Sequence, residues 1–98
     1  IDISHVLGSF KEEEGITIVV EKRVADEMKL TYSFVSSWIT LQVHSSMEAV
    51  GLTAAFSRAL SDAGISCNVI AAFYHDHIFV PVNDKLRAME TLTRLSQY

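Results

Sequence analysis

The sequence predicts an α+β fold in which one antiparallel sheet carries its helices on a single face. Two observations lead to this class. Strand-like and helix-like patterns alternate along only 98 residues, a length that supports one core. The chain contains one proline and four glycines and no Pro-, Gly- or Ser-rich linker, so composition marks no domain boundary.

The first elements are predicted to be a hairpin followed by a short helix. Residues 4–10 and 16–20 are β-rich and flank the sequence KEEEG, in which Gly15 can take the positive φ of a hairpin loop. Residues 21–30 place Val24, Ala25 and Met28 at helical spacing, which indicates a short amphipathic helix.

The next two elements form a strand and a long helix. In residues 38–44 the side chains alternate, with the core face formed by Ile39, Leu41 and Val43. Residues 51–64 are predicted to be a helix that Gly64 ends in the left-handed conformation. One stripe of that helix is apolar and faces the core: Leu52, Phe56, Ala59, Leu60 and Ala63.

The remaining segments predict a second hairpin and a last helix. Residues 67–73 and 77–82 are two strands joined by the turn Tyr74–His77, with Pro81 near a strand end or sheet edge. Asn83 or Asp84 caps a helix over 84–97, whose predicted apolar stripe is Leu86, Met89, Leu92 and Leu95. The order β-β-α, then β-α-β-β-α, is that of a ferredoxin-like fold.

Composition excludes several partner classes. Eight basic and twelve acidic residues give a net charge of −4 without a basic cluster, which argues against a nucleic-acid partner. The apolar runs are far shorter than the roughly 20 residues that span a bilayer, so we expect no membrane partner. The lone Cys67 excludes an internal disulfide and predicts a reducing, cytoplasmic compartment.

The segment His44–Gly51 has two interpretations. Ser45 and Glu48 fit a capping box at the start of a helix, which needs no ligand. Alternatively the helix begins near Gly51, and a polar loop exposes its amides. The helix N-terminus then favours a carboxylate, and Glu48 can hold an ammonium group. That second arrangement describes an amino-acid site.

The turn Tyr74–His77 carries two histidines and an acid. His75 and His77 share one face of a strand while Asp76 points the other way, so three metal ligands require the turn to curl. A structural turn, a metal site and a ligand rim or interface all remain open. The chain lacks the G-x-S-x-G, G-x-G-x-x-G, P-loop and H-E-x-x-H motifs, so we expect no enzyme and no cofactor.

Residues 43–70 (VHSSMEAVGLTAAFSRALSDAGISCNVI) resemble the start of an ACT domain. In that family a strand ends in an Asp-x-Pro-Gly-type loop, and a helix of the form G-L-x-x-I-x-x-x-L-x-x-x-G-I follows. Glu48 replaces the usual Asp and Val50 the Pro, while Gly51 matches the glycine. The strings HSSMEAVGLTAA and YHDHIFVPV are similar to small bacterial ACT-like proteins related to the aspartokinase and arginine-sensor type.

The resemblance implies a βαββαβ plan, a homodimer and regulatory binding of an amino acid or similar small molecule. It further implies that residues 1–37 are the remnant of a first ACT-like half and that 38–98 are an ACT-like domain. That group carries an additional N-terminal segment with another strand. The implied ligand-binding residues are His44, Ser45, Ser46, Glu48, Val50, Gly51, Leu52 and Asn68, with His75 and His77 at the rim.

The leading hypothesis is therefore a non-enzymatic, cytoplasmic homodimer that binds an amino acid and regulates a partner. The alternative is an assembly module without a ligand. A less favoured third is a metal site, or a metal-dependent hydrolase, built on His75, Asp76 and His77.

Overall fold

The computed structural model describes residues 2–42 and 46–95, with side chains described for 2–41 and 51–95. The chain divides into two compact units, Ile1–Val35 and Ser36–Tyr98. We call them unit 1 and unit 2 and describe each by itself.

Unit 1 contains the predicted hairpin. A 3-10 helix, Ile3–His5, precedes β1 (Val6–Glu12), which pairs antiparallel with β2 (Gly15–Val20). The turn is tighter than predicted, because Glu12 already pairs with Gly15, whose φ of 152° is a conformation that glycine tolerates. The strand predicted over 4–10 begins two residues later, at Val6, because Ile3–His5 form a 3-10 helix, and it continues to Glu12.

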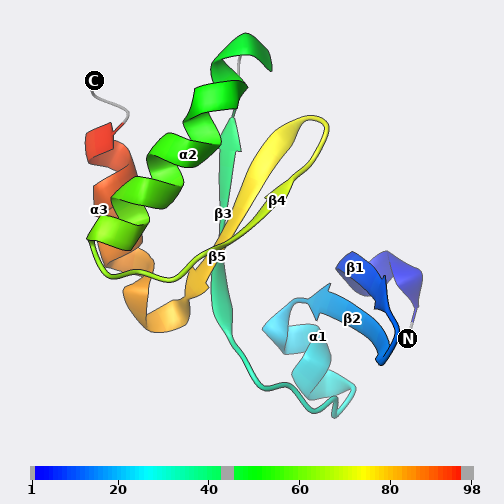
Figure 1. Cartoon of the computed structure of the whole chain (residues 1–98). Helices are drawn as coiled ribbons and strands as arrows, with labels where there is room; N and C mark the ends of the chain where they lie inside the picture. The colour runs from blue at the N-terminus through cyan, green and yellow to red at the C-terminus, as the bar shows by residue number, and fades with distance from the viewer. Residues whose placement is uncertain (1, 43–45, 96–98) are drawn as a thin grey trace. The chain divides into compact units, whose positions relative to one another are not determined.

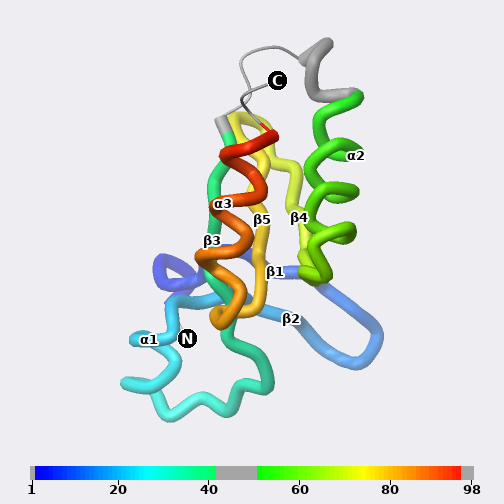
Figure 2. The backbone as a smooth tube through the Cα atoms, turned by 90° about the vertical axis from the view of Figure 1, so that its left-hand side faces the viewer, coloured from blue at the N-terminus to red at the C-terminus, as the bar shows by residue number. Residues whose placement is uncertain are grey.

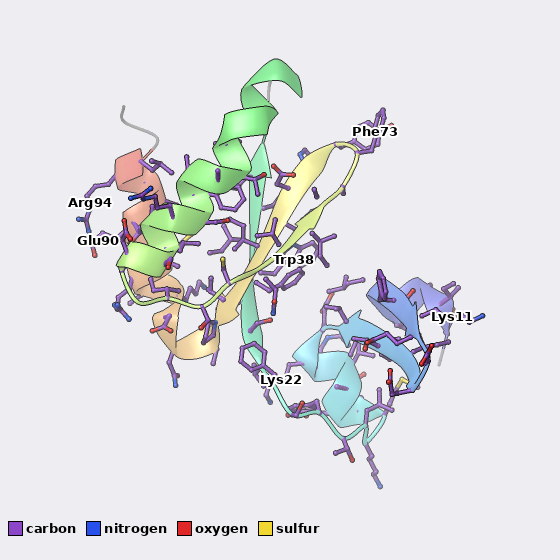
Figure 3. All side chains as sticks on the ribbon, viewed as in Figure 1. Lys11, Lys22, Trp38, Phe73, Glu90 and Arg94 are labelled. Atoms are coloured by element: carbon purple, nitrogen blue, oxygen red, sulfur yellow. The ribbon has the colours of Figure 1, made fainter. Side chains whose placement is uncertain are left out.

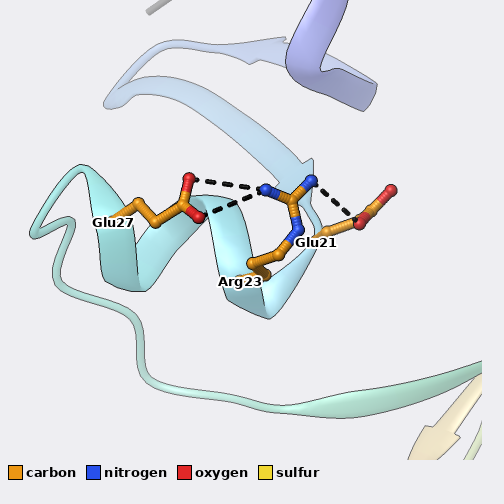
Figure 4. A network of polar contacts seen from close by, with 3 residues as sticks. All are labelled: Glu21, Arg23 and Glu27. Carbon is orange, nitrogen blue, oxygen red and sulfur yellow. Dashed lines mark hydrogen bonds and ion pairs between the residues drawn. The ribbon is translucent and has the colours of Figure 1, made fainter.

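The short helix α1 (Lys22–Glu27) completes unit 1 and buries Val24 and Ala25 as predicted. Met28 follows the helix and is 44% exposed, so its predicted place on the apolar face is wrong. Arg23 makes ion pairs with Glu21 at 3.7 Å and with Glu27 at 3.3 Å (Figure 4). All three side chains are well exposed, so these pairs add little to stability.

Unit 2 is the larger part and follows the predicted order. Its elements are β3 (Ser36–Gln42), α2 (Ser46–Asp62), β4 (Asn68–Ala71), β5 (His75–Pro81), a 3-10 turn (Val82–Asp84) and α3 (Lys85–Leu95). The strands form one antiparallel sheet in the order β3-β5-β4. Both long helices lie on the same face of that sheet (Figures 1 and 2). This confirms the predicted α+β, ferredoxin-type class.

The core of unit 2 lies between the sheet and its two helices. Ile39 of β3 is buried as the alternation predicted, and Trp38 and Thr40 on the other face are exposed. Along β5 the burial alternates strictly, because every second side chain points to the helices. The buried cluster consists of Ile39, Phe56, Leu60, Ile65, Ile78, Val80, Ala88 and Leu92.

The end of α2 confirms the prediction for Gly64. Its φ is 74°, and its N–H donates to the carbonyl of Ser61 at 2.9 Å. Ile65 donates to the carbonyl of Leu60 at 2.9 Å, which completes a Schellman motif. Both Leu60 and Ile65 are buried, so the helix end is also fixed by an apolar contact.

Two predictions about unit 2 are wrong in detail. The second hairpin turns at residues 72–74, so His75–His77 belong to β5 rather than to the turn. Pro81 ends its strand, which is one of its two predicted positions, and that strand is the central one of the sheet. In α3, Leu86 and Met89 are exposed, because Ala88 occupies the core position between them. None of the described helices is long and apolar enough to cross a membrane.

Candidate functional site

The candidate site lies at the end of unit 2 where β3 ends, α2 begins and β5 begins (Figure 1). These three points coincide because β5 runs antiparallel to β3, and because α2 returns along the sheet after the short connection 43–45. The site is therefore built from a strand end, a helix start and the first residues of the central strand.

The structure places the residues of the predicted ligand loop mostly within a helix. His44 and Ser45 lie outside the described residues. Ser46, Glu48 and Val50 form the first turns of α2, whose backbone alone is described there. Gly51 is the sixth residue of the helix and is exposed, while Leu52 is half-buried and packs against the core.

The helix therefore begins five residues earlier than the ligand-loop interpretation required. The unbonded N–H groups of an α-helix are its first four, so here they belong to the segment that starts at Ser46. The Gly51 amide lies beyond them, inside the helix rather than in an open loop, and its contact with a ligand stays a prediction. The space beside Gly51 is open, since a Cβ built there meets no atom within 4 Å.

Asp76 lies opposite the two histidines, as the sequence predicted, but its burial on the core face of the sheet was not predicted. It is the second residue of β5 and shares the core-facing side with Ile78 and Val80. Its register partners are Leu41 on β3 and Ala71 on β4. Only 6% of Asp76 is exposed, and it is the one buried charged residue in the described part of the chain. No described residue makes a hydrogen bond or ion pair with its side chain.

The sequence contained the signal that would have located Asp76. In the string HDHIFV the acid stands two positions before Ile78 and four before Val80, so a strand that starts at His75 must bury it. The assignment of His75–His77 to a turn left open that the face of Asp76 is the core face.

The two histidines lie on the opposite face of the sheet from Asp76. Trp38 Nε1 donates to His77 Nδ1 at 2.9 Å, and Thr40 Oγ1 lies 3.3 Å from the same nitrogen. Because Nδ1 accepts from Trp38, the ring proton of neutral His77 sits on Nε2. The His75 and His77 rings are 6.2 Å apart, and the buried His75 Nδ1 has no hydrogen-bond partner among the described residues.

This arrangement does not assemble the metal site that the sequence left open. His75 and His77 share one face and Asp76 points to the other, so the three cannot meet on one ion. Across the described residues, no three His, Cys, Asp or Glu side chains come close enough to hold a metal.

Asn68 is likewise separated from the start of α2. It pairs with Phe79 in the sheet register and is exposed on the face that carries His75 and His77. The predicted binding residues therefore divide between the two faces of the sheet. An open groove lined by Ser57, Ser61, Gly64, Ile65, Ser66 and Cys67 lies at the far end of α2 and contains none of them.

Comparison with known proteins agrees with the fold of both units. Two models of the ACT domain match the chain, one over residues 33–94 and the other over residues 2–37. Four solved chains match. One is a crystal structure of a protein of unknown function from Vibrio cholerae, described as a possible transport protein. It is 49% identical, with a TM-score of 0.82 over 92% of this chain and 70% of that chain. None of the curated proteins gives a match.

Proposed function

Because this chain belongs to the ACT domain family, whose members are generally regulatory modules that bind small molecules, we propose that unit 2 binds an amino acid where α2 begins. The family membership supports the general role. The ligand class and the site rest on the chemistry of the residues at that end of the sheet.

The observation that carries the proposal is the buried carboxylate of Asp76. An ionised carboxylate in an apolar environment is costly unless a cation or several hydrogen-bond donors accompany it. Asp76 as a whole residue is only 6% exposed and lies on the same face as Ile78 and Val80, and no described residue supplies either. An ammonium group of a ligand satisfies this carboxylate with charge and with three N–H donors.

The start of α2 can bind the carboxylate group of the amino acid. This helix has 17 residues, and its first four N–H groups have no partner within the helix. Those groups and the helix dipole favour a negative charge, so the α-carboxylate of the ligand belongs there. Ser46 and Glu48 stand in the first turn and remain candidates for further contacts.

We assign Asn68, His75 and His77 no part in this site, because they lie on the other face of the sheet. The protein acts without catalysis: the ligand favours one conformation of the module or its assembly and thereby changes the activity of a partner. We further propose that the protein is a homodimer in the cytoplasm. We also propose that residues 1–37 belong to a first ACT-like unit, which the match to an ACT domain model over residues 2–37 supports.

The experiment is a thermal-shift screen of the purified, ligand-free protein against the twenty amino acids. A ligand at 100 times its Kd adds about 2.7 kcal/mol to the free energy of unfolding. For a domain of this size that raises Tm by roughly 10–20 °C. The N-acetyl form of each hit should bind at least tenfold more weakly, because acetylation removes the ammonium charge that Asp76 pairs with.

The matched variants are Asp76→Asn and Asp62→Asn. Both remove one acidic charge, but Asp62 is exposed near the end of α2, with 75% of its side chain accessible. We expect Asp76→Asn to abolish the shift and Asp62→Asn to leave it unchanged. A folded protein that responds to none of the twenty amino acids contradicts the proposal, as does equal binding by both variants.

A further inference from the structure

The face of the sheet that the helices of unit 2 leave open carries a small aromatic cluster. It consists of Trp38 on β3 and of His77 and Phe79 on β5. Trp38 and Phe79 are register partners, and their rings lie 6.2 Å apart at an interplanar angle of 19°. The rings of Trp38 and His77 lie 5.5 Å apart. Trp38 is the one tryptophan of the chain, and it projects from β3 on the open side of the sheet (Figure 3).

One hydrogen bond fixes how the indole lies in this cluster. Trp38 Nε1 donates to His77 Nδ1 at 2.9 Å, although 49% of Trp38 is exposed and water can reach the side chain. An indole N–H can only donate, so the bond requires that Nδ1 of His77 carries no proton. The neutral imidazole with its proton on Nε2 meets this requirement. The imidazolium does not, because both of its nitrogens carry a proton.

Thr40 supplies the partner that protonated His77 needs. It is the register partner of His77 on β3, and its Oγ1 lies 3.3 Å from the same Nδ1. A threonine hydroxyl can accept as well as donate, so it can receive a hydrogen bond from a protonated Nδ1. The two neighbours of this nitrogen therefore select opposite states of the ring: Trp38 bonds only to neutral His77, and Thr40 accepts only from the protonated form.

The surroundings of His77 hold no charged group that fixes its state. The described side chains on this face of β3 and β4 are all uncharged: Ser36, Trp38, Thr40, Asn68 and Ile70. On β5 itself Phe79 and His75 share the face, and His75, with its ring 6.2 Å away, is the one titratable neighbour among the described side chains of the sheet. Asp76 points to the core face instead. The protonation of His77 therefore decides which hydrogen bond the cluster makes.

We propose that His77 is a pH-sensitive switch on the open face of the sheet, which holds Trp38 at neutral pH and releases it in acid. Histidine is the side chain whose charge ordinarily changes between about pH 5 and 8. Uptake of one proton from water by Nδ1 removes the acceptor of the Trp38 bond and gives Thr40 a donor in its place. The indole N–H then turns to water, and the open face gains one positive charge.

The switch changes what the open face offers to another molecule. At neutral pH the face is uncharged, and its tryptophan lies nearly parallel to Phe79, an arrangement that favours apolar contact. In acid the face carries an imidazolium and an indole donor without a protein partner, so an apolar molecule that covers it must desolvate a charge. The core is unaffected, because its strand residues point to the other face: Ile39, Ile78 and Val80.

The test follows the indole N–H of Trp38 in the ligand-free full chain by proton–nitrogen correlation NMR while the pH is lowered from about 8 to about 5. One tryptophan gives one such resonance. We expect an upfield shift of its proton in a single step, because a hydrogen bond to the imidazole nitrogen is lost. Circular dichroism over the same range should show that the protein stays folded.

The matched variants are His77→Gln and His75→Gln. Both remove one histidine from the same face of β5, but only His77 bonds to Trp38. We expect the step to disappear in His77→Gln, since glutamine has no charge to gain, and to remain in His75→Gln. The other two histidines of the chain are present in both variants, so they serve as internal controls.

Each of the remaining outcomes overturns the switch. A wild-type resonance that does not move, a step that persists in His77→Gln, or a step that coincides with unfolding of the wild type assigns the acid response to another group or to none. If His77→Gln does not fold, the ring nitrogens of His77 in the wild type decide. Their NMR shifts must show Nε2 protonated and Nδ1 free at neutral pH, and Nδ1 must take up its proton together with the step of the indole. The opposite tautomer, or a proton taken up at a different pH, contradicts the proposal.

Discussion

Replacing the buried Asp76 should make the protein more stable while removing its ligand site. The variant Asp76→Val keeps a branched side chain that suits a strand and takes the ionisable group out of the core. In the wild type the residue Asp76 is 6% exposed as a whole, and its side chain lies on the same face as Ile78 and Val80. Binding sites commonly carry such locally unfavourable groups, because function and stability are selected separately.

The expected gain follows from the two terms that the substitution changes. A buried polar group without a partner costs about 1–3 kcal/mol in protein mutational data. The Asp76 oxygens are not among the fully buried side-chain atoms without a partner, so Val removes only part of that penalty, and the small change in volume adds little strain. The net gain in the free energy of unfolding is about 1 kcal/mol, which raises Tm by roughly 4–8 °C in a domain of this size.

Chemical denaturation and calorimetry of the ligand-free protein measure this change directly. A structural role gives the opposite sign: a carboxylate that accepts hydrogen bonds from the first amides of α2 acts as a helix cap, and losing a cap costs about 0.5–2 kcal/mol. A fall in stability for Asp76→Val would refute the reasoning, because the acid then belongs to the fold. The exposed Asp62→Asn serves as control and should change stability by less than about 0.5 kcal/mol.

Three further predictions concern backbone, core and charge. Gly64→Ala should lower the free energy of unfolding by about 1–2 kcal/mol, because φ is 74° at this position. Gly51→Ala, inside α2, should raise it by about 0.5–1 kcal/mol. Urea titrations of the two variants measure both changes. Phe56→Ala, at a side chain 1% exposed, should cost about 3–5 kcal/mol by the same assay. The hydrogen bond from Lys22 lowers the pKa of Asp26. Asp26 therefore stabilises unit 1 at a pH above the pKa of the unfolded residue, and this contribution is lost as the pH falls through the lowered pKa of the folded state. NMR titration of Asp26 measures the lowered pKa, and acid unfolding curves that are identical for the wild type and Asp26→Asn contradict the prediction.

The fold could be predicted from the sequence because local and global signals agree in unit 2. Ile39 alternates with exposed Trp38 and Thr40, and Gly64 occupies the left-handed position that ends α2. The predictions for individual residues were wrong where two neighbouring residues fitted the same pattern. Ala88 and Met89 are neighbours with similar helical propensity, and only packing against the sheet decides which one is buried.

The candidate site was predicted only in part, for a physical reason. The start of α2 was one of two interpretations of residues 44–51, since a capping box and a ligand loop use the same Ser and Glu types. The sequence separates Asp76 from its histidine neighbours, but its burial could not be predicted without knowing that β5 begins at His75. Residues in a turn do not alternate between two faces, so only a strand that includes Asp76 places it on the core face with Ile78 and Val80.

The proposed ligand site lies where two elements of unit 2 meet, and that connects ligand binding to assembly. β3 ends at Gln42 and α2 begins at Ser46, so a ligand bound there contacts both elements. A ligand that favours one placement of α2 against β3 therefore changes the surface that unit 2 offers to a second copy or to a partner. Linkage requires the effect to be reciprocal: whatever factor the ligand applies to the dimer affinity, dimerisation applies to the ligand affinity. A module built in this way needs no catalytic group to regulate a partner, because a change in its assembly is itself the output.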